Sequence, residues 1–78
     1  MRSREKAIRY LDHALTRMQE RGISKQHVEK AVRAPDQVRE AKNKGARRFE
    51  KKISSRRRIA VIAGESDREF EVITAFWL

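Results

Sequence analysis

Hydrophobic side chains recur every three or four positions through the first quarter of the chain. The repeating positions are Ile8, Leu11, Leu15 and Met18. Because successive residues of an α-helix are rotated by about 100°, these positions form one apolar stripe, which predicts an amphipathic helix over residues 4–21. Ser3 is suited to cap this helix, and Glu5 favours the positive end of the helix dipole in the first turn.

The end of this helix and the start of the next are encoded side by side. Gly22 can adopt the left-handed conformation that ends many helices, so it is predicted to close the first one. Ser24 is expected to cap a second helix, and Ile23 before it can pack on Val28. Pro35 ends this second helix, because the residue before a proline avoids the helical region. Two helices joined by so short a turn are predicted to form a hairpin.

The spacing of hydrophobic residues changes in the second half of the chain and becomes typical of β-strands. Strands are expected at residues 38–41, 47–53, 59–63 and 70–78. On the second of these strands, the apolar Phe49 and Ile53 share one face. Arg48 and Lys52 share the opposite face, which should remain uncovered. The predicted fold class is α+β, with an N-terminal helical hairpin packed on a three- to four-stranded antiparallel sheet (α-α-β-β-β-β), and residues 1–78 are expected to form one domain.

The chain is strongly basic, with 20 lysine and arginine residues, 11 aspartate and glutamate residues and a net charge of +9. Residues 35–64 carry ten basic and three acidic side chains, whereas residues 65–78 carry one basic and four acidic ones. A basic body of this kind is typical of proteins that bind polyanions, so RNA or the ribosome is the expected partner. The alternative is a charged solvated surface, as heat-adapted proteins often have.

The sequence argues against disulfide, metal and membrane chemistry. There is no cysteine, which excludes disulfides and thiolate zinc sites. The two histidines are not spaced as metal ligands, so neither a metal nor a cofactor is expected. No apolar run approaches the roughly 20 residues that span a bilayer, and the first residues lack the apolar centre of a signal peptide. A cytoplasmic protein without a membrane segment is expected.

Four short motifs along the chain match the pattern of one protein family. They are HALTRMQERGIS at residues 13–24, V-x-x-A-V-x-x-P after it, and later R-R-F-E and V-I-T-A-F. With these motifs the chain, from about residue 8 to residue 77, resembles a family of small bacterial and archaeal proteins described as a domain of unknown function. That family is itself similar to RelE/ParE-type toxins, which include ribosome-dependent mRNA endonucleases. The resemblance implies a RelE/ParE-like fold, an RNA substrate and an acidic antitoxin partner. The positions that match the family pattern are His13, Arg17, Arg21, Gly22, Ile23, Ser24, Pro35 and Thr74.

His13, Arg17 and Arg21 are spaced four residues apart and therefore share one face of the first helix. Cleavage of RNA without a metal needs a base for the 2′-hydroxyl, an acid for the leaving 5′-oxygen, and cations for the phosphate. Histidine can serve as acid or base near neutral pH, and a guanidinium can donate two hydrogen bonds to a phosphate. His13 and Arg17 are therefore predicted to be catalytic, and Arg21 to bind substrate. The alternative is a hydrated helix face, and the second histidine, His27, is expected at the surface.

A second group of basic residues is predicted on the strand over residues 47–53. Arg47, Arg48, Lys51 and Lys52 are predicted to bind the RNA backbone through phosphate contacts. The alternative is that these charges only protect an exposed strand from aggregation.

The two aromatic residues near the C-terminus are adjacent in a strand and so point to opposite faces of the sheet. Trp77 is expected to pack in the core, and the alternatives are a homodimer contact, an antitoxin contact or stacking on a base. RelE-like nucleases often carry an aromatic hydroxyl near this end, whereas this chain ends Phe76-Trp77-Leu78.

The sequence thus predicts a small basic RNA-directed protein, with a toxin-like, metal-independent endoribonuclease as the leading hypothesis. Two alternatives are open: a non-catalytic nucleic-acid-binding module, and a domain whose charge binds an acidic protein partner. An acidic protein encoded beside this gene would favour the toxin. A gel shift of RNA without cleavage would favour the binding module.

Overall fold

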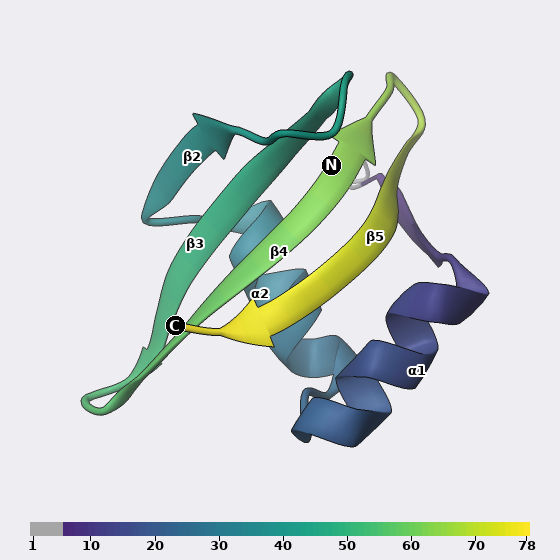
Figure 1. Ribbon diagram of the computed structural model, residues 1–78. Helices are drawn as coiled ribbons and strands as arrows, with labels where there is room; N and C mark the ends of the chain where they lie inside the picture. The colour runs from purple at the N-terminus through teal and green to yellow at the C-terminus, as the bar shows by residue number, and fades with distance from the viewer. Residues whose placement is uncertain (1–5) are drawn as a thin grey trace.

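The computed structural model describes residues 6–78 and shows two helices on a five-stranded sheet (Figure 1). The elements in chain order are β1 (Ala7–Tyr10), α1 (Asp12–Arg21), α2 (Lys25–Arg33), β2 (Gln37–Glu40), β3 (Ala46–Ser54), β4 (Arg57–Glu65) and β5 (Glu69–Trp77). The strands lie in the order β1-β5-β4-β3-β2. Helix α2 lies behind β3 and β4 in Figure 1, and α1 lies alongside β5. The sheet face turned toward the viewer, opposite the buried side chains of Phe49, Val61 and Val72, is called the open face below.

The N-terminal strand β1 corrects the predicted first helix. Residues 7–10 pair in parallel with β5 and are not the first turns of a helix over residues 4–21. The backbone N–H of Leu11 donates to the carbonyl of Val72 at 3.2 Å, and the helix begins only at Asp12. The sequence Ala-Ile-Arg-Tyr fits the alternation of a strand as well as the stripe of a helix. The pairing of these residues with β5, near the C-terminus, makes them a strand rather than part of a helix.

The predicted α-α-β-β-β-β layout is wrong in two respects. The four strands expected after Pro35 are present as β2 to β5, but β1 adds a fifth strand in parallel, so the sheet is mixed rather than antiparallel. The helices follow β1 and do not form a hairpin that precedes the sheet, because each buries its apolar side on different strands: α1 on β5, and α2 on β3 and β4. The predicted cap Ser3 and the first-turn Glu5 lie outside the described residues.

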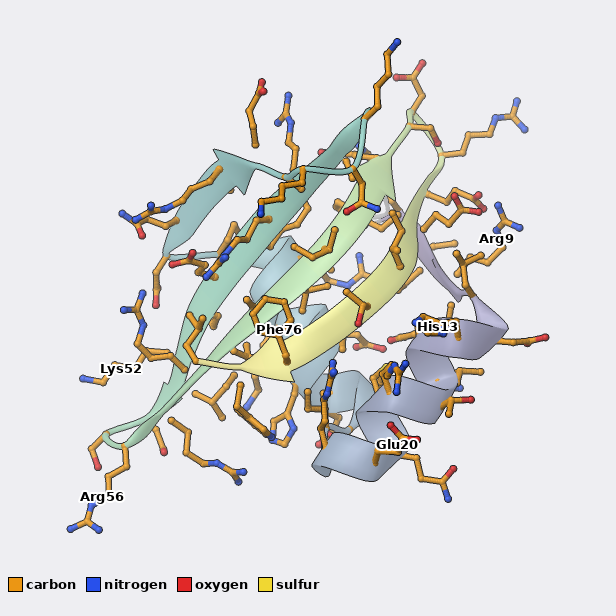
Figure 2. The ribbon with its side chains drawn as sticks, viewed as in Figure 1. Arg9, His13, Glu20, Lys52, Arg56 and Phe76 are labelled. Carbon is orange, nitrogen blue, oxygen red and sulfur yellow. The ribbon has the colours of Figure 1, made fainter. Side chains whose placement is uncertain are left out.

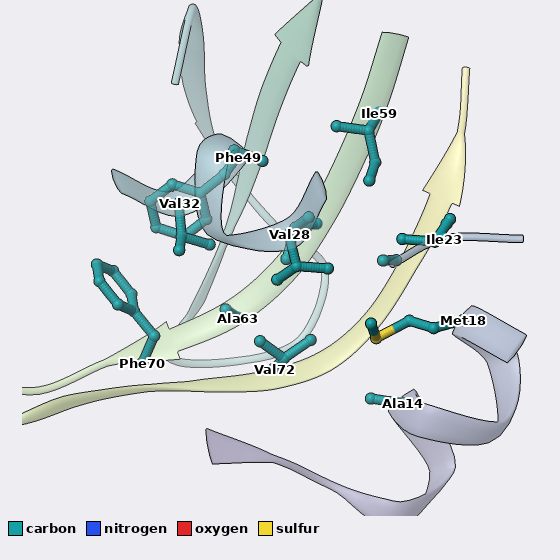
Figure 3. Close-up of a cluster of buried hydrophobic side chains, with 13 residues drawn as sticks. Ala14, Met18, Ile23, Val28, Val32, Phe49, Ile59, Ala63, Phe70 and Val72 are labelled. Carbon is teal, nitrogen blue, oxygen red and sulfur yellow. The ribbon is translucent and has the colours of Figure 1, made fainter. Parts of the chain in front are cut away.

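The core lies between the helices and the sheet face that they cover (Figure 3). The rings of Phe49 and Phe70 meet edge to face, with centroids 5.7 Å apart. Ala14 and Met18 are the buried side chains of α1, whereas Leu15, predicted on its apolar stripe, is 38% exposed. The buried side of α1 therefore differs from the predicted stripe. Ile8 and Leu11, which were part of that stripe, lie before the first residue of the helix, Asp12.

The segment between the helices agrees with the sequence prediction. Gly22 has φ 68°, in the left-handed region that favours glycine. Ser24 caps α2: its hydroxyl accepts from the backbone N–H of His27 at 3.2 Å, and His27 Nδ1 accepts from the backbone N–H of Ser24 at 3.1 Å. The helix ends at Arg33, two residues before Pro35. These local contacts fix where α1 stops and α2 starts.

Candidate nucleic-acid interface

The open face carries three rows of side chains that run across the strands. The strand register sets the members of each row opposite one another on β2, β3, β4 and β5. The first row is Arg39, Arg48, Ile62 and Thr74, the second is Gln37, Glu50, Ala60 and Phe76, and the third is Lys52 and Arg58. The face is therefore cationic over β2, β3 and the start of β4, and largely apolar toward β5.

Two pairs of like charge face each other directly on this surface. Arg39 lies opposite Arg48, and Lys52 lies opposite Arg58. Like charges in directly opposed positions destabilise an antiparallel pair of strands. Folding alone does not favour such pairs, so each one is a cost in free energy that a nearby negative charge would reduce.

Glu50 lies between these two pairs. It is the buried charged residue of the described chain, with 4% of its surface exposed. Its Oε2 lies 2.8 Å from Arg48 Nε and 3.7 Å from Arg39 Nε. Its Oε1 lies 3.4 Å from Arg58 Nη2. One carboxylate thus contacts three guanidinium groups, which leaves the cluster with an excess of positive charge.

Phe76 stands on the open face beside these cations (Figure 2). The guanidinium carbon of Arg48 lies 5.4 Å from its ring centroid, within the range of a cation–π interaction. An open groove of about 530 Å³ includes Phe76, Arg48, Ile62 and Thr74 in its walls. The face therefore combines a half-buried ring with guanidinium groups, which suits a ligand that has both aromatic bases and phosphates.

The four basic residues predicted on β3 separate onto two faces. Arg48 and Lys52 lie on the open face, as their alternation with Phe49 predicts. Arg47 and Lys51 lie on the opposite side, which is the side of Phe49. The structure therefore brings two of the four predicted residues together.

Arg47 and Lys51 contact other parts of the chain than the open face does. Lys51 Nζ lies 3.6 Å from Asp36 Oδ1, and the backbone N–H of Lys52 donates to Asp36 Oδ2 at 2.8 Å. The hydrogen bond from Lys52 is the main reason that the pKa of Asp36 is lowered, and the charge of Lys51 adds to it. Arg47 lines a separate groove of about 650 Å³ beside the β2–β3 and β4–β5 loops. Neither residue is part of the open face.

Of the two arginine residues predicted on α1, Arg21 contacts β5 and Arg17 pairs within the helix. Arg21 Nη1 donates to the carbonyl of Ala75 at 2.9 Å and lies 3.5 Å from Thr74 Oγ1. Because Thr74 belongs to the first row, Arg21 connects α1 with the open face. Arg17 Nη1 pairs with Glu20 Oε1 at 3.0 Å, one turn along the same helix.

His13 is exposed near the start of α1, and this helix runs beside β5 (Figure 2). It precedes Arg17 by one turn, so the two side chains project from the same flank of the helix. None of the hydrogen bonds and ion pairs found within residues 6–78 engages its imidazole. The imidazole is exposed on this part of the structure, where a ligand could reach it.

Replacing Arg21 with methionine should destabilise the protein by roughly 1–3 kcal/mol, because the partly buried carbonyl of Ala75 loses its donor. Urea unfolding followed by circular dichroism measures this loss. Arg17→Met is the matched control, and it should cost less than about 0.5 kcal/mol because Arg17 makes only a surface ion pair. Equal losses in the two variants would show that the Arg21–Ala75 contact does not hold α1 in place.

Trp77 packs at the end of the sheet, as the sequence predicted. Its Nε1–H donates to the carbonyl of Arg21 at 2.7 Å. The ring and the imidazole of His27 form an edge-to-face pair with centroids 5.2 Å apart, and the guanidinium of Arg57 lies 3.9 Å from the Trp77 ring centroid. Phe76, rather than Trp77, is the C-terminal aromatic residue on the open face.

The acidic C-terminal segment lies at the other end of the sheet. Arg9 Nε lies 3.1 Å from Glu69 Oε2, and Arg9 Nη2 lies 2.5 Å from Glu71 Oε2. Lys6 pairs with Glu65 nearby. At this end Lys6 and Arg9 are each paired with a carboxylate, so the excess positive charge of the open face stays on β2, β3 and β4.

Sequence reasoning does not bring three residues of this face together: Arg39, Glu50 and Arg58. A signal exists for Glu50, because alternation along β3 sets it on the face of Arg48 and Lys52. Arg39 and Arg58 lie on other strands, and only the register of β2, β3 and β4 brings them to Glu50.

Two further observations concern metals and membranes. Within residues 6–78, no group of three or more histidine, cysteine, aspartate or glutamate side chains could hold a metal ion. No helix in this same part of the chain is long and apolar enough to cross a membrane.

These features define a class: a small α+β domain with two helices, a five-stranded mixed sheet and a basic open face that carries an aromatic ring. The chain belongs to the family described as Domain of unknown function (DUF4258), which matches residues 10–77. The matched region contains both helices and all three rows of the open face. No curated protein and no solved structure matches the chain.

Proposed function

We propose that the protein is an RNA-directed cytoplasmic protein that binds single-stranded RNA on the open face of its sheet. The observation that carries this proposal is the pairing of like charges, Arg39 with Arg48 and Lys52 with Arg58, beside the half-buried ring of Phe76. An RNA backbone would relieve the repulsion within both pairs. The net charge of +9 would also attract a polyanion from a distance.

Each part of the open face suits a different part of an RNA strand. Guanidinium groups donate paired hydrogen bonds to phosphate oxygens, and Lys52 adds a compact positive charge. A base can stack on Phe76, a contact that is tolerant of sequence and requires an unpaired base. The surface therefore favours a single strand of mixed sequence over a duplex, whose bases are not available for stacking.

The variants Arg48→Ala and Lys52→Ala should each show a weaker salt dependence of RNA binding, with a slope smaller than that of the wild type by about one unit. Each cation that contacts a phosphate releases counterions, and these set the slope of the logarithm of the binding constant against that of salt. Fluorescence anisotropy with a labelled single-stranded RNA, measured from about 50 to 200 mM salt, gives the slope.

Lys51→Ala is the matched control for this measurement. It removes the same charge from the neighbouring position of β3, on the other face of the sheet. Its slope should equal that of the wild type. If all three variants show the wild-type slope, the open face does not contact phosphate and the proposed RNA site is wrong.

A metal-independent endoribonuclease, related to RelE/ParE-type toxins, is the second candidate function. The observation that favours it is the exposed imidazole of His13, on the helix that Arg21 joins to Thr74 of the open face. In such a reaction a base takes the proton of the 2′-hydroxyl, whose oxygen then attacks the phosphorus. The bond to the 5′-oxygen breaks, and an acid protonates the leaving group. His13 is proposed to transfer one of these protons, with Arg17 and Arg21 near the phosphate.

If the protein is a toxin of this kind, two partners are proposed: the ribosome, on which it would cleave mRNA, and an acidic antitoxin that would inhibit it. Both would meet the same basic surface, since ribosomal RNA and an acidic protein present negative charge. A homodimer is a further proposal, for which light scattering of the purified protein is the test. Cleavage assays with and without ribosomes distinguish the nuclease from the binding module.

A further inference from the structure

We propose that Glu50 is the internal counter-ion of a phosphate-binding site formed by Arg39, Arg48 and Arg58, and that a bound phosphate takes over its contacts with these guanidinium groups. The inference rests on the proposed function only in that RNA supplies the phosphate. The site itself is a feature of the folded chain and can be tested with inorganic phosphate.

The position of Glu50 is unusual for a carboxylate. It is 4% exposed although it projects from the face that no helix covers, because the three arginine side chains enclose it. A buried charge is costly unless it is paired, and here the partners come from three neighbouring strands. The carboxylate therefore lies where β2, β3 and β4 can share it.

A single carboxylate does not satisfy this cluster. Arg48 Nε is buried and, within residues 6–78, makes no hydrogen bond, although it lies 2.8 Å from Glu50 Oε2. The contact is thus a close charge pair with poor hydrogen-bond geometry. A phosphate has more acceptor oxygens than a carboxylate and can be approached by several guanidinium groups at once.

The remaining donors of the cluster are accessible. The side chains of Arg39 and Arg58 are 59% and 49% exposed, and both project from the open face. Three guanidinium groups carry up to fifteen N–H donors by their chemistry, roughly five each, so Glu50 engages only a few of them. An anion can therefore reach the cluster from solvent without unfolding any strand.

Two effects of opposite sign follow from this arrangement. Glu50 stabilises the free protein, because it offsets the repulsion between the arginine residues. The same negative charge opposes an incoming phosphate. Removing the charge should therefore weaken the fold and strengthen anion binding. If Glu50 had a purely structural role, its replacement would lower both the stability and the affinity for anions.

The experiment compares the wild type with Glu50→Gln, which keeps the size of the side chain. The melting temperature of the free variant should fall by roughly 4–8 °C. Inorganic phosphate, added at constant ionic strength against chloride, should raise its melting temperature by more than that of the wild type. Its dissociation constant for single-stranded RNA should decrease by about 3- to 10-fold.

Two further variants make the result specific. Glu29→Gln changes the net charge equally but lies exposed on α2, so its melting temperature and RNA affinity should stay near those of the wild type. Arg39→Gln in the Glu50→Gln background removes one of the repelling charges and should recover part of the lost melting temperature. Lost packing or a lost hydrogen bond would not be recovered by removing an arginine.

The outcomes separate this inference from the proposed function. Weaker RNA binding by Glu50→Gln, or equal stabilisation of both proteins by phosphate, would show that the counter-ion inference is wrong even where the wild type binds RNA. If the wild type does not bind RNA but phosphate stabilises Glu50→Gln more strongly than the wild type, the anion site stands and the proposed RNA ligand is wrong.

Discussion

Replacing His13 with alanine should reduce the rate of RNA cleavage by about 10²- to 10⁴-fold if the protein is an endoribonuclease, which is the usual contribution of a positioned acid or base. The stability should change by less than about 0.5 kcal/mol, because His13 is exposed and outside the core. The measurement is cleavage of defined RNAs by both proteins, with and without ribosomes, together with their melting temperatures.

His27→Ala is the matched control for this substitution. His27 is the second histidine of the chain; its imidazole accepts a hydrogen bond in the cap of α2 and forms an edge-to-face pair with Trp77. Its loss should lower stability by about 1 kcal/mol and leave the cleavage rate of the folded protein unchanged. A large loss of stability in His13→Ala would show that His13 is structural. Equal cleavage by His13→Ala and the wild type would exclude it as the acid or base.

Replacing Phe49 with alanine should destabilise the protein by about 3–5 kcal/mol, the largest effect on stability expected from the variants considered. The ring fills the space between α2 and the sheet and meets Phe70 edge to face, and alanine would leave a cavity there. A domain of 78 residues has a total stability of roughly 4–12 kcal/mol, so this loss is a large fraction of it. Urea unfolding followed by circular dichroism gives the difference.

Phe76→Ala is the control, since it makes the same change on the open face of the same sheet. It should cost less than about 1.5 kcal/mol but weaken RNA binding, because a ring that stacks on a base contributes about 1–3 kcal/mol. Phe49→Ala should not change RNA affinity under conditions in which it is folded. If the two variants lose equal stability, Phe76 is packed as tightly as the core, and the open face is covered in solution.

The end of α1 and both ends of α2 could be predicted because they depend on neighbouring residues only. Gly22 is left-handed, Ser24 caps α2, and Pro35 follows its end, each through contacts within a few positions of itself. Alternation along one strand is equally local, and it set Arg48 and Lys52 on the open face correctly. The packing of Trp77 follows from the same alternation and from its large apolar surface.

The errors lie where distant segments compete for the same residues. Ile8 fitted the apolar stripe of a helix, but the structure uses it in β1, opposite Phe70 of β5. Once those residues leave the helix, α1 rotates, Leu15 turns outward, and Ala14 takes the buried position. No pattern within residues 7–21 contains this information, because the partner strand lies near the end of the chain.

The sequence by itself determined the excess of positive charge, the start of α2 and the face of Arg48 and Lys52 on β3. Only the tertiary structure decided that Arg39, Arg48 and Arg58 meet at Glu50, and that Arg21 joins α1 to Thr74. The physical reason is that propensity and alternation act over a few residues, whereas strand register is set by the burial of whole faces. The cluster around Glu50 depends on the register of β2, β3 and β4, so it could not be predicted from any one segment of the sequence.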